Sequence, residues 1–109
     1  MLMIYFKYII DLVMYFSTGK GENCKKGQII DKESACKTAA SYLGFSYEHI
    51  NSSVDQPAGC FWHSIDNPTK PSDYHGFFNT ITDPSVTNPL GFGSRGGMCM
   101  KSGKNPKLL

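Results

Sequence analysis

Four small or apolar residues recur at helical spacing in the first half of the chain. They stand at positions i, i+3, i+4 and i+7 and form one stripe along a helix: Cys36, Ala39, Ala40 and Leu43. Asp31 can accept hydrogen bonds from the first backbone N–H groups, and Gly44 favours the left-handed conformation that ends many helices. The pattern therefore predicts one amphipathic helix over about 32–43, with Asp31 as its N-cap.

Short β-prone stretches surround this helix. Aromatic and β-branched residues gather in them, and segments rich in Pro, Gly, Asn and Asp separate them, as turns separate the strands of a sheet. The predicted strands cover residues 28–30, 45–50, 60–65, 75–81 and 97–101. The expected fold class is α+β, with the single helix packed on a small antiparallel sheet.

Residues 1–19 are mostly apolar, with Lys7 and Asp11 as the only charged residues among them. Small residues at 17–19, followed by a polar stretch from Lys20, are typical of the cleavage region of a secretory signal peptide. The alternatives are an N-terminal apolar helix, a misassigned start ahead of a fragment of a longer chain, and a membrane anchor. Membrane contact is expected only through this segment, if it is not cleaved.

Composition limits the class of protein but does not indicate an activity. The chain has 109 residues, a net charge of +2 and 40% hydrophobic residues, which fits one small globular domain. A charge balance so close to neutral argues against a nucleic-acid partner, because such proteins carry a clustered basic surplus. We expect the domain to cover residues 20–101, with 102–109 as a flexible tail.

The chain contains four cysteines, all beyond the apolar segment. An even number in so small a body predicts disulfides formed in an oxidising compartment. Cys36 lies on the helix stripe, and Cys60 begins the strand that the helix would cover. We therefore expect the disulfides Cys36–Cys60 and Cys24–Cys99.

Two other uses of the cysteines remain open. One is a zinc site that combines cysteines with histidines, from the set Cys60, His63, His75 and Cys99. The spacing of these residues fits no compact zinc knuckle, in which ligands come in two close pairs. The other is a set of free thiols in a cytosolic fragment. We predict no metal and no cofactor.

Aromatic and polar residues gather on and between the predicted strands 60–65 and 75–81. One face of these strands must cover the helix, and aromatic rings beside His and Asn on the other face are typical of a platform for a carbohydrate or a peptide. The candidate ligand-binding residues are Trp62, His63, Tyr74, His75, Phe78 and Asn79. The alternative is that the rings form core on both faces of a thin sheet.

The histidines also allow a catalytic interpretation. His63 and His75 are the residue type of a general base, and three aspartates are available to orient them: Asp66, Asp73 and Asp83. The chain contains no Gly-x-Ser-x-Gly nucleophile motif. No catalytic residue is therefore assigned.

A longer series of short motifs resembles a known kind of module. In order, the motifs are Ile30-Asp31, Cys36-x-x-Ala39-Ala40-x-x-Leu43-Gly44, Pro57-Ala58-Gly59-Cys60-Phe61, Phe77-Phe78-Asn79 and Cys99. Over about 24–101, this order resembles short extracellular cysteine modules of algal and marine-invertebrate proteins. More distantly, it is similar to the PAN/apple fold, which implies protein or carbohydrate binding and no catalysis. The chain has fewer cysteines than a typical apple domain, so no individual binding residue is carried over.

These observations predict a secreted, two-disulfide recognition module whose partner is an extracellular protein or a glycan. Asn51-Ser52-Ser53 is a sequon, which makes Asn51 a candidate glycosylation site in a secreted chain. The alternatives from other classes are a small secreted hydrolase or enzyme fragment that uses His63 and His75, and a structural protein of the extracellular matrix.

Overall fold

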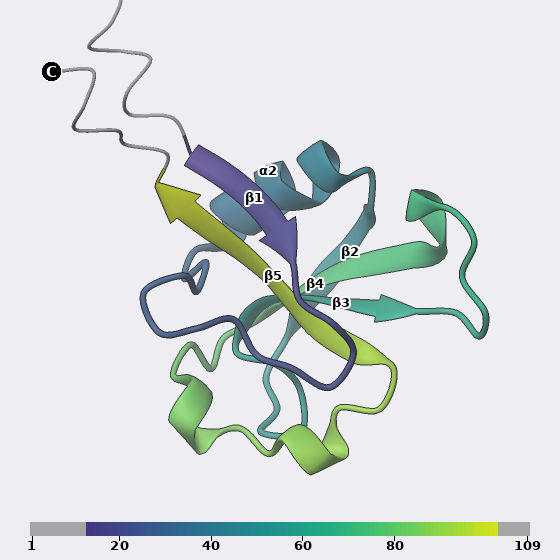
Figure 1. Ribbon diagram of the computed structural model, residues 1–109. Coiled ribbons are helices and arrows are strands. Elements are labelled where there is room, and N and C mark those ends of the chain that lie inside the picture. Colours follow the sequence, from purple (N-terminus) through teal and green to yellow (C-terminus); the bar gives the residue numbers. More distant parts are fainter. Residues whose placement is uncertain (1–12, 103–109) are drawn as a thin grey trace, which may run out of the picture.

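The computed structural model describes residues 13–102, in which one α-helix packs against a five-stranded sheet (Figure 1). The strands are β1 (Val13–Ser17), β2 (Ser46–Asn51), β3 (Gly59–Ser64), β4 (Tyr74–Asn79) and β5 (Arg95–Ser102), in the order β1-β5-β3-β4-β2. The helix is α2 (Glu33–Leu43), and three single 3-10 turns lie in the loops: η1 (Pro71–Asp73), η2 (Pro84–Val86) and η3 (Pro89–Gly91). The α+β class predicted from the sequence is confirmed.

The sheet is mixed, which corrects the expectation of a purely antiparallel sheet. The pairs β1–β5, β5–β3 and β3–β4 are antiparallel, but β2 pairs with β4 in parallel. Because β4 lies between β2 and β3, the loop 52–58 must carry the chain past it. The alternation of apolar residues along a strand is the same in either direction, so the sequence pattern could not reveal the parallel pair.

Helix α2 ends where the sequence predicts but begins differently. Lys32 occupies the N-cap position without a side-chain hydrogen bond, and Asp31 is exposed ahead of it, so the predicted Asp31 cap is wrong. At the other end Gly44 has a φ of 78°, and the Phe45 N–H donates to the Ala40 carbonyl at 2.8 Å. This left-handed glycine turns the chain directly into β2.

Both faces of the sheet are covered. On one face, α2 packs its small residues against a cluster that includes Trp62 of β3, Phe78 of β4 and Met98 of β5. On the other face, Phe61 is fully buried and stacks on Phe77 with 5.3 Å between the ring centroids. The prediction of core on both faces of a thin sheet is therefore confirmed for Phe61, Trp62 and Phe78.

Two disulfides cross-link the fold. Cys36 bonds to Cys60 and joins α2 to β3, while Cys24 bonds to Cys99 and joins the segment before the helix to β5. Both predicted pairs are confirmed, and no cysteine in residues 13–102 is free. Their sulfur atoms are therefore not available as zinc thiolates.

The two disulfides lie on opposite faces of the sheet, as the glycines of β5 show. A Cβ on Gly97 would meet the Cys24 sulfur at 2.7 Å, whereas a Cβ on the preceding Gly96 would meet the Trp62 indole at 2.6 Å. Adjacent residues of a strand point to opposite faces, so Cys24–Cys99 lies on the face away from Trp62 and the helix.

The sheet extends beyond the expected range of 20–101 at both ends. Val13 pairs with Ser102 and Ser17 with Met98, so that the last part of the apolar segment is an edge strand and not the end of a helix. Residues 13–19 of the predicted signal peptide form β1 and the segment after it, so cleavage after residue 19 would remove an edge strand of this sheet. Residues 1–12 and the tail 103–109 lie outside the described residues, and the leader and the flexible tail stay predictions. Within residues 13–102, no helix is long and apolar enough to span a membrane.

Replacing either disulfide with a pair of alanines should destabilise the fold, more for the longer loop. Cys36–Cys60 closes a separation of 24 residues and Cys24–Cys99 one of 75. Chain entropy predicts losses of about 3.5 and about 4.5 kcal/mol in the free energy of unfolding. Urea denaturation of the two double variants beside the native protein measures both losses. Unchanged midpoints would contradict the prediction.

Gly59→Ala should destabilise the protein by about 2–4 kcal/mol. Gly59 has a φ of 66°, and a methyl group there would collide with the Ile30 carbonyl oxygen. Gly21→Ala is the matched control, because Gly21 has a φ of 82° and a methyl group there would have no atom within 4 Å. The control should lose only about 1 kcal/mol through backbone strain. Equal urea midpoints for the two variants would show that the collision is absent.

Candidate functional site

The six candidate ligand-binding residues fall into three groups in the structure. Trp62 and Tyr74 line a pocket at the end of the β3–β4 hairpin, whereas His63 and His75 are paired elsewhere on that hairpin. Phe78 is buried in the helix-facing core and Asn79 is completely buried. Neither residue lines that pocket, and Asn79 has no exposed surface, so the pocket does not support their expected role in ligand binding.

Asn79 holds the crossing loop in place. Its Nδ2 donates to the Ser53 and Pro57 carbonyls at 2.8 and 3.0 Å, and its Oδ1 accepts from the Ser53 and Ile81 N–H groups at 3.2 and 3.1 Å. A buried side chain with this many backbone partners stabilises local structure. Asn79 is therefore a structural residue of the loop between β2 and β3.

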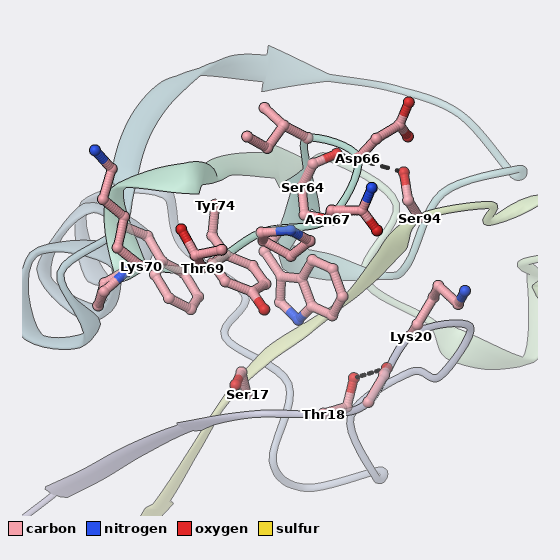
Figure 2. Close-up of a pocket in the computed structure, with 16 residues that line it drawn as sticks. Ser17, Thr18, Lys20, Ser64, Asp66, Asn67, Thr69, Lys70, Tyr74 and Ser94 are labelled. Atoms are coloured by element: carbon pink, nitrogen blue, oxygen red, sulfur yellow. Dashed lines mark hydrogen bonds between the residues drawn. The ribbon is translucent and has the colours of Figure 1, made fainter.

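A pocket of about 950 Å³ lies between two segments that are distant in the sequence. One is the strap, residues 17–20, which follows β1, and the other is the loop at residues 64–71. Phe45, Trp62, Tyr74 and Ser94 complete the wall of this space, which we call the Trp62 pocket. Figure 2 shows Ser17, Thr18 and Lys20 on one side, with Thr69, Lys70 and Tyr74 on another and Ser64, Asp66, Asn67 and Ser94 on a third.

Three aromatic rings form a connected group at the pocket. Tyr74 stacks on Phe45 at 5.0 Å and meets Trp62 edge-on at 5.2 Å, both measured between ring centroids. Phe45 directly follows the glycine that ends α2, and the β3–β4 pairing brings the other two close together. Such packing fixes the ring orientations, since each ring restricts the others.

Backbone hydrogen bonds to one aspartate shape the loop of the pocket. The Asp73 carboxylate accepts from the Thr69 N–H at 2.9 Å and from the Lys70 N–H at 3.2 Å, and also from the Thr69 hydroxyl at 3.3 Å. The Thr69 N–H bond is the main cause that holds the pKa of Asp73 below its usual range. Asn67 has a φ of 54°, a conformation that Asn tolerates better than most residues. The loop thus has a defined shape.

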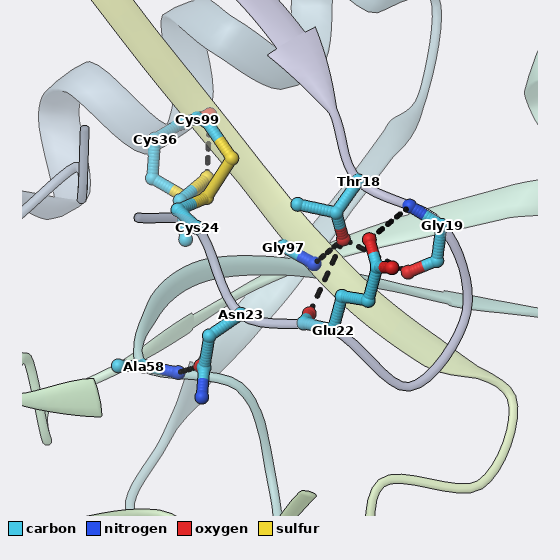
Figure 3. Close-up of a disulfide and its surroundings, with 10 residues drawn as sticks. Thr18, Gly19, Glu22, Asn23, Cys24, Cys36, Ala58, Gly97 and Cys99 are labelled. Atoms are coloured by element: carbon cyan, nitrogen blue, oxygen red, sulfur yellow. Dashed lines mark hydrogen bonds between the residues drawn. A yellow bond between two sulfur atoms is a disulfide. The ribbon is translucent and has the colours of Figure 1, made fainter. Parts of the chain in front are cut away.

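The strap is attached to β5 by a small set of hydrogen bonds (Figure 3). The Thr18 N–H donates to the Gly97 carbonyl at 2.9 Å, and its hydroxyl oxygen accepts from the Gly97 N–H at 2.8 Å. The Gly21 N–H donates to the Arg95 carbonyl at 2.7 Å. Residues that the sequence pattern assigns to the end of a leader therefore form one wall of the pocket.

The polar groups around the pocket are mostly neutral. They comprise hydroxyls, one side-chain amide, the two ammonium groups of Lys20 and Lys70, and the carboxylate of Asp66. Figure 2 shows the two lysines on different sides of the pocket, so they do not form a common anion-binding centre. The pocket can therefore form hydrogen bonds with a ligand beside its aromatic rings.

His63 and His75 do face each other, but not in the Trp62 pocket. They are register partners on β3 and β4, and the His75 Nδ1 lies 3.0 Å from the Glu48 carboxylate. None of the three lines the pocket. The three aspartates expected to orient them lie elsewhere. Asp66 lines the pocket, Asp73 fixes its own loop, and Asp83 accepts from the Ser85 N–H and hydroxyl. The carboxylate beside the histidines is therefore Glu48.

Two further expectations concern single features. Asn51 is the half-buried last residue of the edge strand β2, and its carbonyl accepts from the Thr80 N–H at 2.9 Å. Its glycosylation stays a prediction. Across residues 13–102, no three or more His, Cys, Asp or Glu side chains are grouped so as to hold a metal ion.

No family model, no curated protein and no solved structure matches this chain. The resemblance to algal and marine-invertebrate cysteine modules, and to the PAN/apple fold, stays a prediction.

Sequence reasoning finds two residues of the pocket and misses the rest. The strap is missed because the apolar residues before it indicate a leader. Phe45 is missed because its position after Gly44 indicates only a residue that packs on the end of the helix. The 64–71 loop has the composition of a turn. Its Asn, Thr and Lys side chains, which follow Trp62 in the sequence, are the feature that could have indicated a binding site. The missing information is the antiparallel β1–β5 pair that brings the strap to the hairpin.

His63 should make the fold less stable as the pH falls below about 6.5. Burial, then the charge of Arg95, then that of His75 lower the pKa of His63. Because the pKa of His63 is lower in the folded state, the unfolded chain binds the proton more readily. The contribution of neutral His63 to stability is therefore complete above its unfolded-state pKa and is lost as the pH falls through its folded-state pKa. The free energy of unfolding, measured in urea between about pH 7.5 and 5, should fall less in His63→Gln than in the native protein. Identical pH slopes would contradict this.

Proposed function

We propose that this chain is a secreted recognition module that binds a neutral carbohydrate in the Trp62 pocket. The observation that carries the proposal is the group of three packed aromatic rings beside hydroxyl and amide side chains from two separate segments. A sugar ring has an apolar face of C–H groups and an edge of hydroxyls, so it matches a site that offers aromatic surface and hydrogen bonds together.

The size and the charge of the pocket support a sugar over other ligands. Its volume of about 950 Å³ lies at the upper end of the range of roughly 300–1,000 Å³ for small-molecule sites, and several sugar units fit such a space. Lys20 and Lys70 lie on different sides, which favours a neutral ligand over an anion. Extracellular localisation is supported by the two disulfides, because such bonds persist in oxidising compartments.

The chain offers a direct readout of binding. It contains one tryptophan, and that residue lines the pocket, so its fluorescence reports on this site alone. We would titrate the intact protein with neutral tetrasaccharides of glucose, mannose, galactose and N-acetylglucosamine. At least one of them should change the emission in a saturable way.

Tyr74→Phe should weaken the binding of that tetrasaccharide by about three- to ten-fold, because it removes one hydrogen-bonding hydroxyl and keeps the ring. Tyr42→Phe is the matched control, since Tyr42 is 71% exposed on α2 and does not line the pocket. The control should bind like the native protein. Emission that no tetrasaccharide alters, or equal affinities for the two variants, would overturn the proposed site.

A further inference from the structure

Trp62 carries a polar atom that the fold leaves unpaired. Its side chain is only 5% exposed, and its Nε1 is buried without a hydrogen-bond partner among the described residues. Indole Nε1 is a donor only, and a buried donor without a partner destabilises a folded chain. The other unpaired buried atom in residues 13–102, Gln56 Oε1, belongs to a residue that does not line the Trp62 pocket. The unpaired donor of Trp62 therefore lies at the candidate site itself.

The indole cannot turn to find another partner. Tyr74 packs edge-on against it, and Gly96 lies so close to its Cζ2 and Cε2 atoms that a Cβ there would come within 2.6 and 2.7 Å of them. Cε2 is bonded to Nε1, so Gly96 lies beside the part of the ring that carries the N–H. Packing therefore fixes the direction of this donor.

The strap also lies against Gly96. A Cβ on Gly96 would meet the Gly19 carbonyl oxygen at 2.6 Å, so this oxygen and the indole both contact the same point of β5. The Gly19 carbonyl already accepts from the Thr18 hydroxyl at 2.9 Å, and it makes no hydrogen bond with the indole. The strap thus lies close to the indole but does not pair with the Trp62 N–H.

We propose that the Trp62 N–H donates a hydrogen bond to an oxygen of the bound carbohydrate, which makes Trp62 the residue that selects for an acceptor at this position. This role rests on the proposed function. The Nε1 atom is buried in this structure, so a ligand can reach it only if part of the pocket wall shifts, and the strap is the part of that wall beside Gly96 and the indole. The strap is exposed, and Thr18–Gly97 hydrogen bonds hold it at the edge of the sheet, so the shift leaves the core intact.

The first test follows the indole proton in the native protein. A single tryptophan gives a single indole resonance in a ¹H–¹⁵N NMR spectrum. Addition of the tetrasaccharide that binds should move this proton downfield, as formation of a hydrogen bond does. The side-chain amide of Asn88, which donates to Asp55 outside the pocket, is the internal control and should not move. A bound state with an unshifted indole proton would overturn the proposal.

The second test removes the donor and keeps an aromatic ring. Trp62→Phe should weaken binding of the same tetrasaccharide about ten-fold or more, measured by isothermal calorimetry. Met98→Val is the matched control, because Met98 belongs to the same core cluster and does not line the pocket. Urea titration measures the loss of stability in each variant. If Met98→Val lost as much stability and weakened binding as much as Trp62→Phe, core destabilisation would explain the effect and the proposal would fail.

The outcomes separate the role of the N–H from the carbohydrate site. Binding that depends on Tyr74 but leaves the indole proton unmoved, with Trp62→Phe as tight as native, supports the carbohydrate site and overturns the role of the N–H. Failure of all four tetrasaccharides to bind overturns both. A downfield indole shift together with a selective loss in Trp62→Phe supports both.

Discussion

The fold depends on two disulfides that act from opposite faces of one thin sheet. Cys36–Cys60 fixes the helix to the central strand β3, and Cys24–Cys99 fixes the segment before the helix to β5 on the other face. The helix contributes mainly Cys and Ala to the core, so it buries little apolar surface of its own. A domain of this size has a marginal core, and cross-links that restrict the unfolded chain supply much of the missing stability.

The same cross-links position the candidate site. Trp62 stands two residues beyond Cys60 on β3, and therefore on the same face, where the covered core gives way to the pocket. Gly96 leaves room for the indole beside β5, and Gly97 leaves room for Cys24 on the opposite face. These two adjacent glycines thus let β5 lie close to Trp62 on one face and to the Cys24–Cys99 disulfide on the other. A side chain at either position would push apart the elements that form the site.

Hydrogen bonds, more than ion pairs, give the loops their shape. Asn79 anchors the crossing loop, and Asn23 joins Ala58 and Thr87 from two further loops at 2.8 Å each. The described ion pairs, Lys37–Glu33 and His75–Glu48, are solvent-accessible, and such pairs contribute little to stability. The loop of the pocket is also held by hydrogen bonds, from the Thr69 and Lys70 N–H groups to the Asp73 carboxylate.

The sequence by itself determined the helix, its glycine terminus, most strand positions, the α+β class and both disulfide pairs, because these follow from local periodicity and from the few ways to pair four cysteines. Only the tertiary structure decided that β2 runs parallel to β4, that residues 13–17 form a strand, and that Asn79 is a buried anchor while Trp62 lines a pocket. Alternation along a strand shows which residues share a face. It does not show the direction of the strand, its neighbours in the sheet or how deeply each side chain is buried. The pocket joins residues 17–20 to residues 64–71, and long-range pairing of this kind leaves no periodic trace in the chain.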